Sequence, residues 1–213
     1  MIKFPPLIDK LKLYAIVPDF NWLKKLVDLD IKSIQLRVKS ESLDYVIKNI
    51  EKSINYIKNS DIQFFINDYW ELAIKFSAYG VHLGQEDLKN ADLNKIKSAN
   101  LRLGISTHNL LEFNNSLKLK PSYIACGTIF PTNTKVMKTK SLGIDQLKNF
   151  CNISQEYPIV AIGGINIYNA KDIIATGVNG IAVISAITQS VDTKTTINNF
   201  NKFQLILITF FFI

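Results

Sequence analysis

The composition of this chain is that of a globular protein. Its 213 residues are 47% hydrophobic and 20% charged, which is enough for one large domain with a substantial core. The formal net charge of +7 indicates affinity for anions. However, the 25 Lys and Arg residues form no run of five or six and no basic helix face, which argues against a nucleic-acid-binding protein.

Short apolar, β-branched runs recur along the chain, and each is followed by a segment with helical spacing. Strands are expected, in chain order, within residues 12–18, 33–39, 62–68, 79–84, 101–107, 123–131, 158–165 and 180–187. The clearest helix is 41–60, where aliphatic residues fall on one stripe. Shorter helices are expected at 22–27, 70–76, 88–96, 110–117, 144–150 and 170–175. These runs are typical of the buried strands of a parallel sheet covered on both faces.

This alternation of strand and helix predicts the fold. Eight units without a Pro/Gly/Ser linker indicate one domain, 1–213, folded as a closed (β/α)8 (TIM) barrel with a core at about 12–190. An open doubly wound sheet is the alternative, but no GxGxxG follows the first strand. Almost every predicted strand ends in polar or glycine residues. In a barrel these ends meet on one face, so a site is expected there.

Two carboxylates follow neighbouring predicted strands. Asp68 comes directly after Asn67 at the end of the third run, and Asp87 lies just beyond the fourth. Carboxylate oxygens suit Mg²⁺, which usually keeps waters and substrate phosphates as its other ligands. The alternative is that each Asp caps the N-terminus of a helix.

Basic side chains in the second run are expected at the same face. Gln35, Arg37 and Lys39 alternate along the run, so all three are predicted to point into the barrel. Buried polar groups need partners, and these are either an anionic ligand or a structural salt bridge. Arg offers phosphate a bidentate fork, and Lys offers it a point charge.

Two further segments are candidates for phosphate binding. Gly163 and Gly164 follow the seventh run and Ser185 ends the eighth, the usual position of a phosphate in a barrel. The segment "IFPTNTK" (129–135) turns from apolar residues to hydroxyls and an ammonium group. The alternatives are glycines that serve only a turn and a loop that is merely solvated.

The chain has two histidines. His82 alternates with apolar neighbours, which indicates a hydrogen-bonded interior residue, whereas His108 lies beside Ser106 and Thr107 near the expected site. Neither belongs to a Ser-His-Asp or Cys-His nucleophile arrangement. The chemistry is therefore expected to depend on electrostatic stabilisation rather than on a covalent intermediate.

The cysteines and the chain ends bear on location. Cys126 and Cys151 lie far apart and outside any CxxC pattern, as reduced thiols of a cytosolic protein do. The N-terminus lacks a secretory pattern, and the apolar C-terminus is shorter than the about 20 residues that span a bilayer. A cytoplasmic protein without a membrane partner is expected.

These segments, in this order, resemble the thiamine-phosphate synthase family over about residues 12–190. The matching segments are "QLRVK" (35–39), "IND" (66–68), "GVHLGQED" (80–87), "GISTH" (104–108), "IFPTNTK" (129–135), "AIGGI" (161–165) and "AVISAI" (182–187). The resemblance implies a (β/α)8 barrel and a transferase of thiamine biosynthesis. Its small-molecule substrates would be an aminopyrimidine diphosphate and a thiazole phosphate, and its products thiamine phosphate and diphosphate.

The resemblance also implies residue roles. The aminopyrimidine diphosphate would be bound by Gln35, Leu36, Arg37, Val38, Lys39, Asn67, Ser106 and Lys135. Of these, Arg37, Lys39, Ser106 and Lys135 would be catalytic. The thiazole phosphate would be bound by Thr132, Asn133, Thr134, Gly164, Ile184 and Ser185. Asp68 and Asp87 would hold Mg²⁺. The implied mechanism is dissociative: the methylene–oxygen bond of the pyrimidine ionises, and the thiazole nitrogen attacks the resulting cation.

Two other functions stay open at this point. A related thiazole tautomerase shares the fold and a loop histidine near His108, but it has no diphosphate to require both carboxylates and "TNTK". A non-catalytic barrel that binds a phosphorylated metabolite would bind substrate without forming product.

Two segments depart from the family pattern. No proline lies between Lys135 and Gly143, where the family usually has one. The apolar tail, 203–213, lacks the polar face of an amphipathic helix. The tail is interpreted either as a shortened or frameshifted end or as a segment buried in a homo-oligomer.

Overall fold

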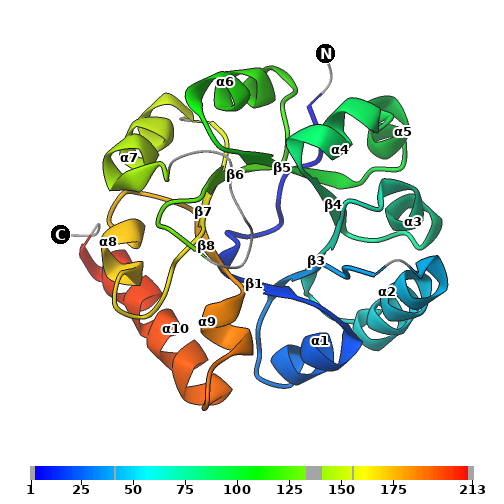
Figure 1. Cartoon of the computed structure of the whole chain (residues 1–213), viewed down its shortest axis with the longest axis horizontal. Helices are drawn as coiled ribbons and strands as arrows, with labels where there is room; N and C mark the ends of the chain where they lie inside the picture. The colour runs from blue at the N-terminus through cyan, green and yellow to red at the C-terminus, as the bar shows by residue number, and fades with distance from the viewer. Residues whose placement is uncertain (1–2, 41, 133–140, 155, 211–213) are drawn as a thin grey trace.

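The computed structural model of the chain describes residues 3–40, 42–132, 141–154 and 156–210. Its centre is a closed barrel of parallel strands, seen end-on in Figure 1. Each strand pairs with the next along the chain, and β8 pairs with β1. The strands are β1 (Lys12–Val17), β2 (Ser33–Leu36), β3 (Gln63–Asn67), β4 (Gly80–Leu83), β5 (Arg102–Thr107), β6 (Tyr123–Gly127), β7 (Ile159–Ile162) and β8 (Gly180–Val183). The predicted closed barrel is confirmed, and the open-sheet alternative is wrong.

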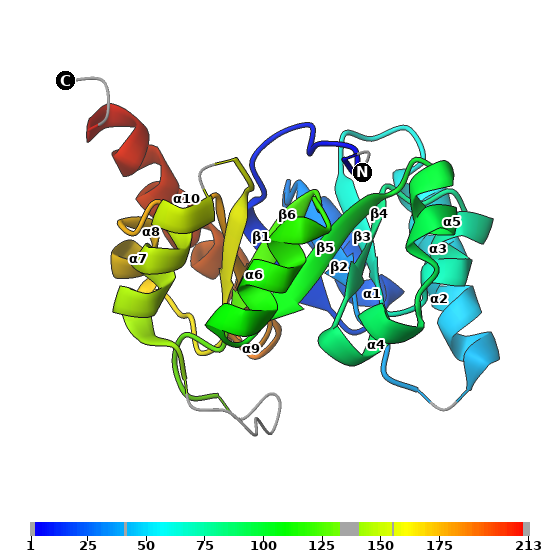
Figure 2. The same ribbon diagram turned by 90° about the horizontal axis from the view of Figure 1, so that it is seen from above.

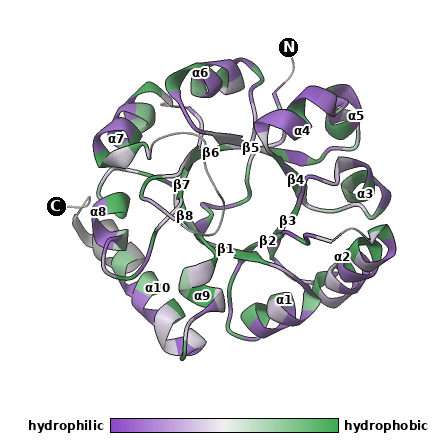
Figure 3. Cartoon of the chain, viewed as in Figure 1, coloured by the Kyte–Doolittle hydropathy of each residue, from purple (hydrophilic) through white to green (hydrophobic). Residues whose placement is uncertain are grey.

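Helices surround the barrel and turn their apolar sides toward it (Figure 3). They are α1 (Phe20–Val27), α2 (Leu43–Ile57), α3 (Trp70–Lys75), α4 (Gln85–Asn90), α5 (Leu93–Ser98), α6 (Leu110–Lys118), α7 (Gly143–Ser154), α8 (Ala170–Ile174), α9 (Ser185–Thr188) and α10 (Thr193–Phe210).

The helix predicted at 88–96 is in fact two helices, α4 and α5. Ala91 is extended, and the Asp92 carboxylate accepts hydrogen bonds from the backbone N–H groups of Asn94 and Lys95, which starts α5. At the other end of the chain, α10 buries Ile197 and Phe200. Its backbone continues as helix to residue 210, so the first part of the apolar tail extends the last helix.

The inside of the barrel is filled by a cluster of its own, which we call the interior cluster. It consists of Leu11, Tyr14, Ile16, Phe65, Tyr123, Ala125, Val160 and Ala182. The rings of Tyr14, Phe65 and Tyr123 meet edge to face, with centroids 5.2–5.8 Å apart. A side chain on Gly104 would collide with the Tyr123 ring, so a glycine is needed on β5 to make room for it.

One end of the barrel is covered by the segment before β1, which crosses the upper side of the molecule in Figure 2. Leu7 packs against the interior cluster. The Arg102 side chain donates a 2.9 Å hydrogen bond to the carbonyl of Pro6, and the backbone N–H of Ile8 donates one of 2.9 Å to the Tyr79 hydroxyl. The amino-terminal ends of the strands are thus covered, and the carboxyl-terminal ends form the opposite mouth.

Within the described ranges, we find no helix both long enough and apolar enough to cross a bilayer.

Candidate active site at the carboxyl-terminal mouth

The two predicted metal-binding carboxylates lie together at this mouth. Partial burial and the neighbouring Asp68 carboxylate raise the pKa of Asp87. Asp68 has a φ of 67°, a left-handed conformation that Asp tolerates better than most residues. Its backbone N–H donates a 2.9 Å hydrogen bond to the His82 carbonyl, which ties the end of β3 to β4.

Neither carboxylate acts as the helix cap that was the alternative interpretation. Tyr69 is the N-cap residue of α3 and has no side-chain cap bond. Gly84 is the N-cap residue of α4, and Asp87 lies in the first turn of that helix. A side chain at Gly84 would start 3.0 Å from an Asp87 carboxylate oxygen, so glycine leaves this carboxylate room.

The basic segment differs in part from its prediction. β2 ends at Leu36, so Arg37 and Lys39 lie in the loop that follows. Gln35 is buried, as predicted. Lys39, in contrast, does not point into the barrel: its side chain is 55% exposed and its Nζ lies 2.8 Å from Oδ2 of Asp68. Arg37 is half-buried and lies near enough to His82 to help lower the pKa of that imidazole.

The side chains of Leu36 and Val38 are buried in the layer between barrel and helices. These two residues can therefore offer a substrate only main-chain atoms. Asn67 ends β3 on the same face as Phe65 and is 6% exposed, so its amide lies at the edge of the interior.

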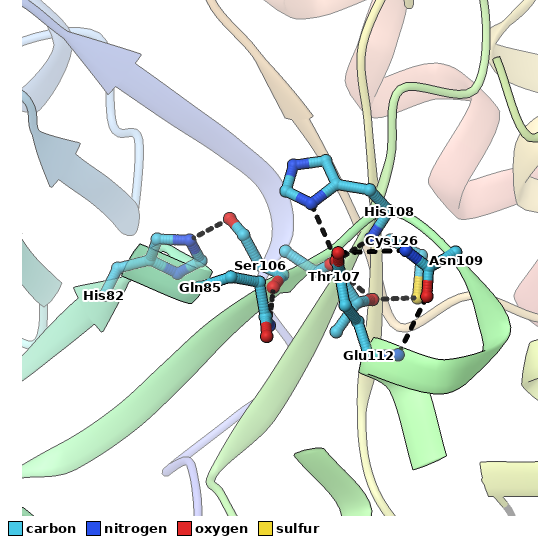
Figure 4. A network of polar contacts seen from close by, with 9 residues as sticks. His82, Gln85, Ser106, Thr107, His108, Asn109, Glu112 and Cys126 are labelled. Atoms are coloured by element: carbon cyan, nitrogen blue, oxygen red, sulfur yellow. Dashed lines mark hydrogen bonds and ion pairs between the residues drawn. The ribbon is translucent and has the colours of Figure 1, made fainter. Parts of the chain in front are cut away.

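Ser106 is held from two sides (Figure 4). Its hydroxyl oxygen lies 2.7 Å from Nε2 of His82, and its carbonyl accepts a 2.6 Å hydrogen bond from the Gln85 side chain. The next residue, Thr107, points to the other face of β5, where its hydroxyl donates to the carbonyl of Ala125. Ser106 therefore points toward the interior and mouth of the barrel, and its position is fixed by β4 and the start of α4.

His82 is a buried interior residue, as predicted. Its Nδ1 lies 2.7 Å from the Tyr123 hydroxyl, and the two rings stack at 5.6 Å. Burial lowers the pKa of His82 to about 4, so the imidazole is neutral near pH 7. The part played by Tyr123 was not predicted, because a tyrosine in an apolar run looks like any other core residue.

His108 lies in the loop after β5 and is paired with a carboxylate. Its Nδ1 lies 2.9 Å from Oε2 of Glu112, which also accepts a 2.8 Å hydrogen bond from the His108 backbone N–H. Asn109 caps α6 and donates to the other Glu112 oxygen. This capping-box spacing, Asn followed three residues later by Glu, was the signal by which Glu112 could have been found.

The predicted phosphate segments meet on the other side of the mouth. Gly163 and Gly164 have φ values of 102° and 67°. The carbonyl of Gly163 accepts a 3.0 Å hydrogen bond from the backbone N–H of Phe130, and Gly164 leaves no room for a side chain against Phe130 and Pro131. The loops after β6 and β7 therefore lie side by side.

The remaining members of the predicted phosphate set are placed in part. Thr132 follows Pro131 directly in this pair of loops. Ile184 is the N-cap residue of the short α9, which begins at Ser185. Asn133, Thr134 and Lys135 lie outside the described residues. Among the described residues, no group of three or more His, Cys, Asp or Glu side chains could hold a metal ion.

Comparison with known proteins identifies the family. Residues 13–187 match the model of the thiamine monophosphate synthase family. The thiamine-phosphate synthases of Escherichia coli O157:H7 (strain EC4115 / EHEC) and Shigella boydii serotype 4 (strain Sb227) are 47% and 48% identical to this chain over 189 residues, 89% of this chain and 90% of each relative.

Solved structures agree. The thiamine phosphate pyrophosphorylase from Pyrococcus furiosus is 31% identical, with a TM-score of 0.79 over 92% of this chain and 96% of that one. The 3-hexulose-6-phosphate synthase from Salmonella typhimurium, 15% identical with a TM-score of 0.69 over 91% of this chain and 98% of that one, shares the fold alone. The sequence matches span the strands that carry the site, and they show that this chain belongs to the thiamine-phosphate synthase family of transferases.

Proposed function

We propose that this transferase joins an aminopyrimidine diphosphate to a thiazole phosphate at the carboxyl-terminal mouth of its barrel, forming thiamine phosphate and diphosphate. The observation that carries the proposal is the meeting of three kinds of group there. Asp68 and Asp87 form a pair of carboxylates next to Lys39. Ser106 is a fixed hydroxyl, and the loop at Gly164 packs against the "IFPT" segment.

The carboxylate pair fits the Mg²⁺ that the family resemblance implies. Partial burial and then repulsion from the neighbouring Asp68 carboxylate raise the pKa of Asp87, and Lys39 pairs with only one of the two carboxylates. A divalent cation relieves that repulsion, and Mg²⁺ commonly takes one or two carboxylates together with water and substrate phosphate oxygens. We assign Asp68 and Asp87 as its ligands. When bound, Mg²⁺ would neutralise charge on the diphosphate.

The basic residues are assigned to the leaving diphosphate. As the methylene–oxygen bond ionises, negative charge accumulates on the departing oxygens. Lys39 lies beside Asp68 and Arg37 lies near His82, and fixed positive groups there would stabilise that charge. Lys135 has the same role in this proposal. The thiazole nitrogen then attacks the pyrimidine cation, and no covalent enzyme intermediate is needed.

Polar interior groups are assigned to the pyrimidine ring and its substituents. Gln35 and Asn67 are buried amides, and Ser106 is held by His82 and Gln85. Because hydrogen bonds hold Gln35 and Ser106 before the substrate arrives, these two groups would orient it at little entropic cost. Leu36 and Val38 contribute main-chain atoms.

The paired loops after β6 and β7, with the start of α9, are assigned to the thiazole phosphate. Gly164, Ile184 and Ser185 would bind it mainly through main-chain groups, and Thr132, Asn133 and Thr134 through their side chains. In this proposal the thiazole phosphate would lie across the mouth from Asp68, which follows β3, and Asp87 in α4, so the two anions would be bound by separate groups.

A direct assay tests the proposal. The purified chain is mixed with both substrates and Mg²⁺, and thiamine phosphate and diphosphate are measured with and without EDTA. We expect both products in equal amounts and their loss when EDTA removes the metal. Folded protein that binds the substrates but forms no product would contradict the catalytic assignment, and full activity in EDTA would contradict the metal assignment alone.

A further inference from the structure

A continuous chain of hydrogen bonds crosses the interior of the barrel. The Gln35 amide donates to the Tyr14 hydroxyl at 3.1 Å, and the hydroxyls of Tyr14 and Tyr123 lie 2.9 Å apart. Tyr123 lies 2.7 Å from Nδ1 of His82, whose Nε2 lies 2.7 Å from the Ser106 hydroxyl. The chain thus runs from β2 through β1, β6 and β4 to β5. Both ends, Gln35 and Ser106, are residues we assign to the pyrimidine substrate.

The direction of each bond follows from counting protons. Burial raises the pKa of both Tyr14 and Tyr123, so each keeps one hydroxyl proton. Tyr14 accepts from Gln35, and among the contacts described Tyr123 is the remaining acceptor for its proton, so we assign that proton to Tyr123. The proton of Tyr123 then has Nδ1 of His82 as its remaining partner. A neutral imidazole that accepts at Nδ1 carries its proton on Nε2, and that proton is donated to the Ser106 oxygen.

We propose that Tyr123 and His82 are positioning residues that commit the Ser106 hydroxyl to donate its own proton outward, to a hydrogen-bond acceptor of the bound aminopyrimidine diphosphate. Because the Ser106 oxygen accepts a hydrogen bond from His82, the Ser106 hydroxyl can donate its own proton to a group bound in the mouth. The inference rests on the proposed role of Ser106 as a substrate contact. It adds that the site recognises an acceptor rather than a donor at this point.

The opposite direction requires an acceptor at the start of the chain, which the Gln35 amide supplies only if its oxygen, rather than its nitrogen, faces Tyr14. With only a carboxylate there, Tyr14 would donate to it, Tyr123 would donate to Tyr14, and His82 would carry its proton on Nδ1. Ser106 would then donate inward to Nε2 and present lone pairs to the mouth. The substitution Gln35→Glu, almost unchanged in volume, introduces such an acceptor and is expected to reverse the chain.

Two tyrosine variants form a matched pair, because each removes one hydroxyl from the same buried cluster. Tyr123→Phe removes the donor to His82, so the tautomer is no longer fixed. Tyr14→Phe leaves the hydroxyl of Tyr123 in place as the donor to His82. A structural role alone predicts similar effects of the two changes on activity. The proposal predicts different ones.

The first measurement is the tautomer itself, by ¹⁵N NMR of the imidazoles. The chain has two histidines, and His108→Gln identifies the His82 signals. We expect His82 to be protonated on Nε2 in the wild type and in Tyr14→Phe, on Nδ1 in Gln35→Glu, and on a mixture of both in Tyr123→Phe. Protonation on Nδ1 in the wild type would overturn the proposal before any substrate is added.

The second measurement is steady-state kinetics with the aminopyrimidine diphosphate. We expect kcat/KM to fall about tenfold in Tyr123→Phe, the effect of about one hydrogen bond, and less than about threefold in Tyr14→Phe. Equal losses in the two variants would overturn the positioning role. If Ser106→Ala keeps full activity while the tautomers are as expected, the assignment of Ser106 to the substrate is wrong and the proposal falls with it, whereas the assignment of the reaction to this chain stands.

Discussion

The Nζ atom of Lys39 lies 2.8 Å from Oδ2 of Asp68, in an ion pair that joins the loop after β2 to the end of β3. In the proposed reaction both partners are needed elsewhere, Lys39 by the diphosphate and Asp68 by Mg²⁺. The pair therefore holds the two groups in place until the substrate arrives.

We expect Lys39→Ala to lower kcat/KM about a hundredfold, the usual effect of removing one group that stabilises developing charge. Stability should change by less than about 1 kcal/mol, since the Lys39 side chain is more than half exposed. The matched control is Lys32→Ala. Lys32, just before β2, is similarly exposed and pairs with Asp30 and with Asp61, which precedes β3, at the other end of the barrel. Steady-state kinetics and thermal unfolding separate the two. Equal activity of both variants would contradict the role of Lys39.

Asp87→Asn should stabilise the metal-free protein while lowering its activity. The raised pKa of Asp87 means that the folded state favours the protonated carboxyl. This contribution to stability is therefore complete below the ordinary carboxyl range and is lost as the pH rises through the raised value. At pH 7 the neutral amide removes the repulsion from Asp68.

Thermal unfolding at pH 7 in EDTA checks this, with the variant expected to have the higher Tm. Added Mg²⁺ should raise the Tm of the wild type more than that of Asp87→Asn, because binding to the folded state stabilises it. An identical rise in both would show that Mg²⁺ does not use this carboxylate.

His82 should make the protein less stable in mild acid. Its folded-state pKa of about 4 is below the ordinary value of 6.5, so only the unfolded chain gains this proton as the pH falls between these values. The contribution of His82 to the free energy of unfolding is therefore complete above pH 6.5, and it is smaller by about 3 kcal/mol at pH 4. The test is urea unfolding of His82→Gln at a series of pH values. Its free energy of unfolding should change less steeply with pH in this window, by a slope that corresponds to up to one proton. An unchanged slope would contradict the assignment.

Gly104→Ala should disturb the packing inside the barrel, although it adds only one methyl group. The new Cβ would collide with the Tyr123 ring, and overpacking of this kind typically costs about 1–3 kcal/mol. Because Tyr123 contacts His82, and His82 contacts Ser106, activity should fall as well. Urea unfolding and kcat/KM give the two results. A variant as stable and as active as the wild type would show that the ring can move freely.

The fold was predictable from the sequence because short apolar, β-branched runs such as β6 and β8 alternate regularly with segments of helical spacing. Polar strand ends likewise indicated the mouth. The limits of β2 were less predictable: an alternating pattern from Gln35 to Lys39 does not show where pairing stops. Asp92, a typical N-cap residue, was a sign that 88–96 divides into two helices. The helical spacing of the aliphatic residues nevertheless favoured a single helix.

The interior chain from Gln35 to Ser106 could not be predicted in the same way. Its tyrosines lie 109 residues apart and become neighbours only when the barrel closes in its actual register, with Tyr123 opposite Gly104. Hydropathy counts a tyrosine as apolar and says nothing about its hydroxyl. Local pattern therefore identifies which residues are inside, whereas their hydrogen-bond partners depend on the three-dimensional arrangement.

The covered end of the barrel bears on the side from which the substrates bind. The interior cluster fills the barrel, and Leu7 with the bonds to Pro6 and Ile8 covers its amino-terminal end, so both substrates are expected to bind from the carboxyl-terminal mouth. Gln35 and Asn67, which we assign to the pyrimidine, are buried. If both substrates bind from the same side, we expect the aminopyrimidine diphosphate to bind before the thiazole phosphate.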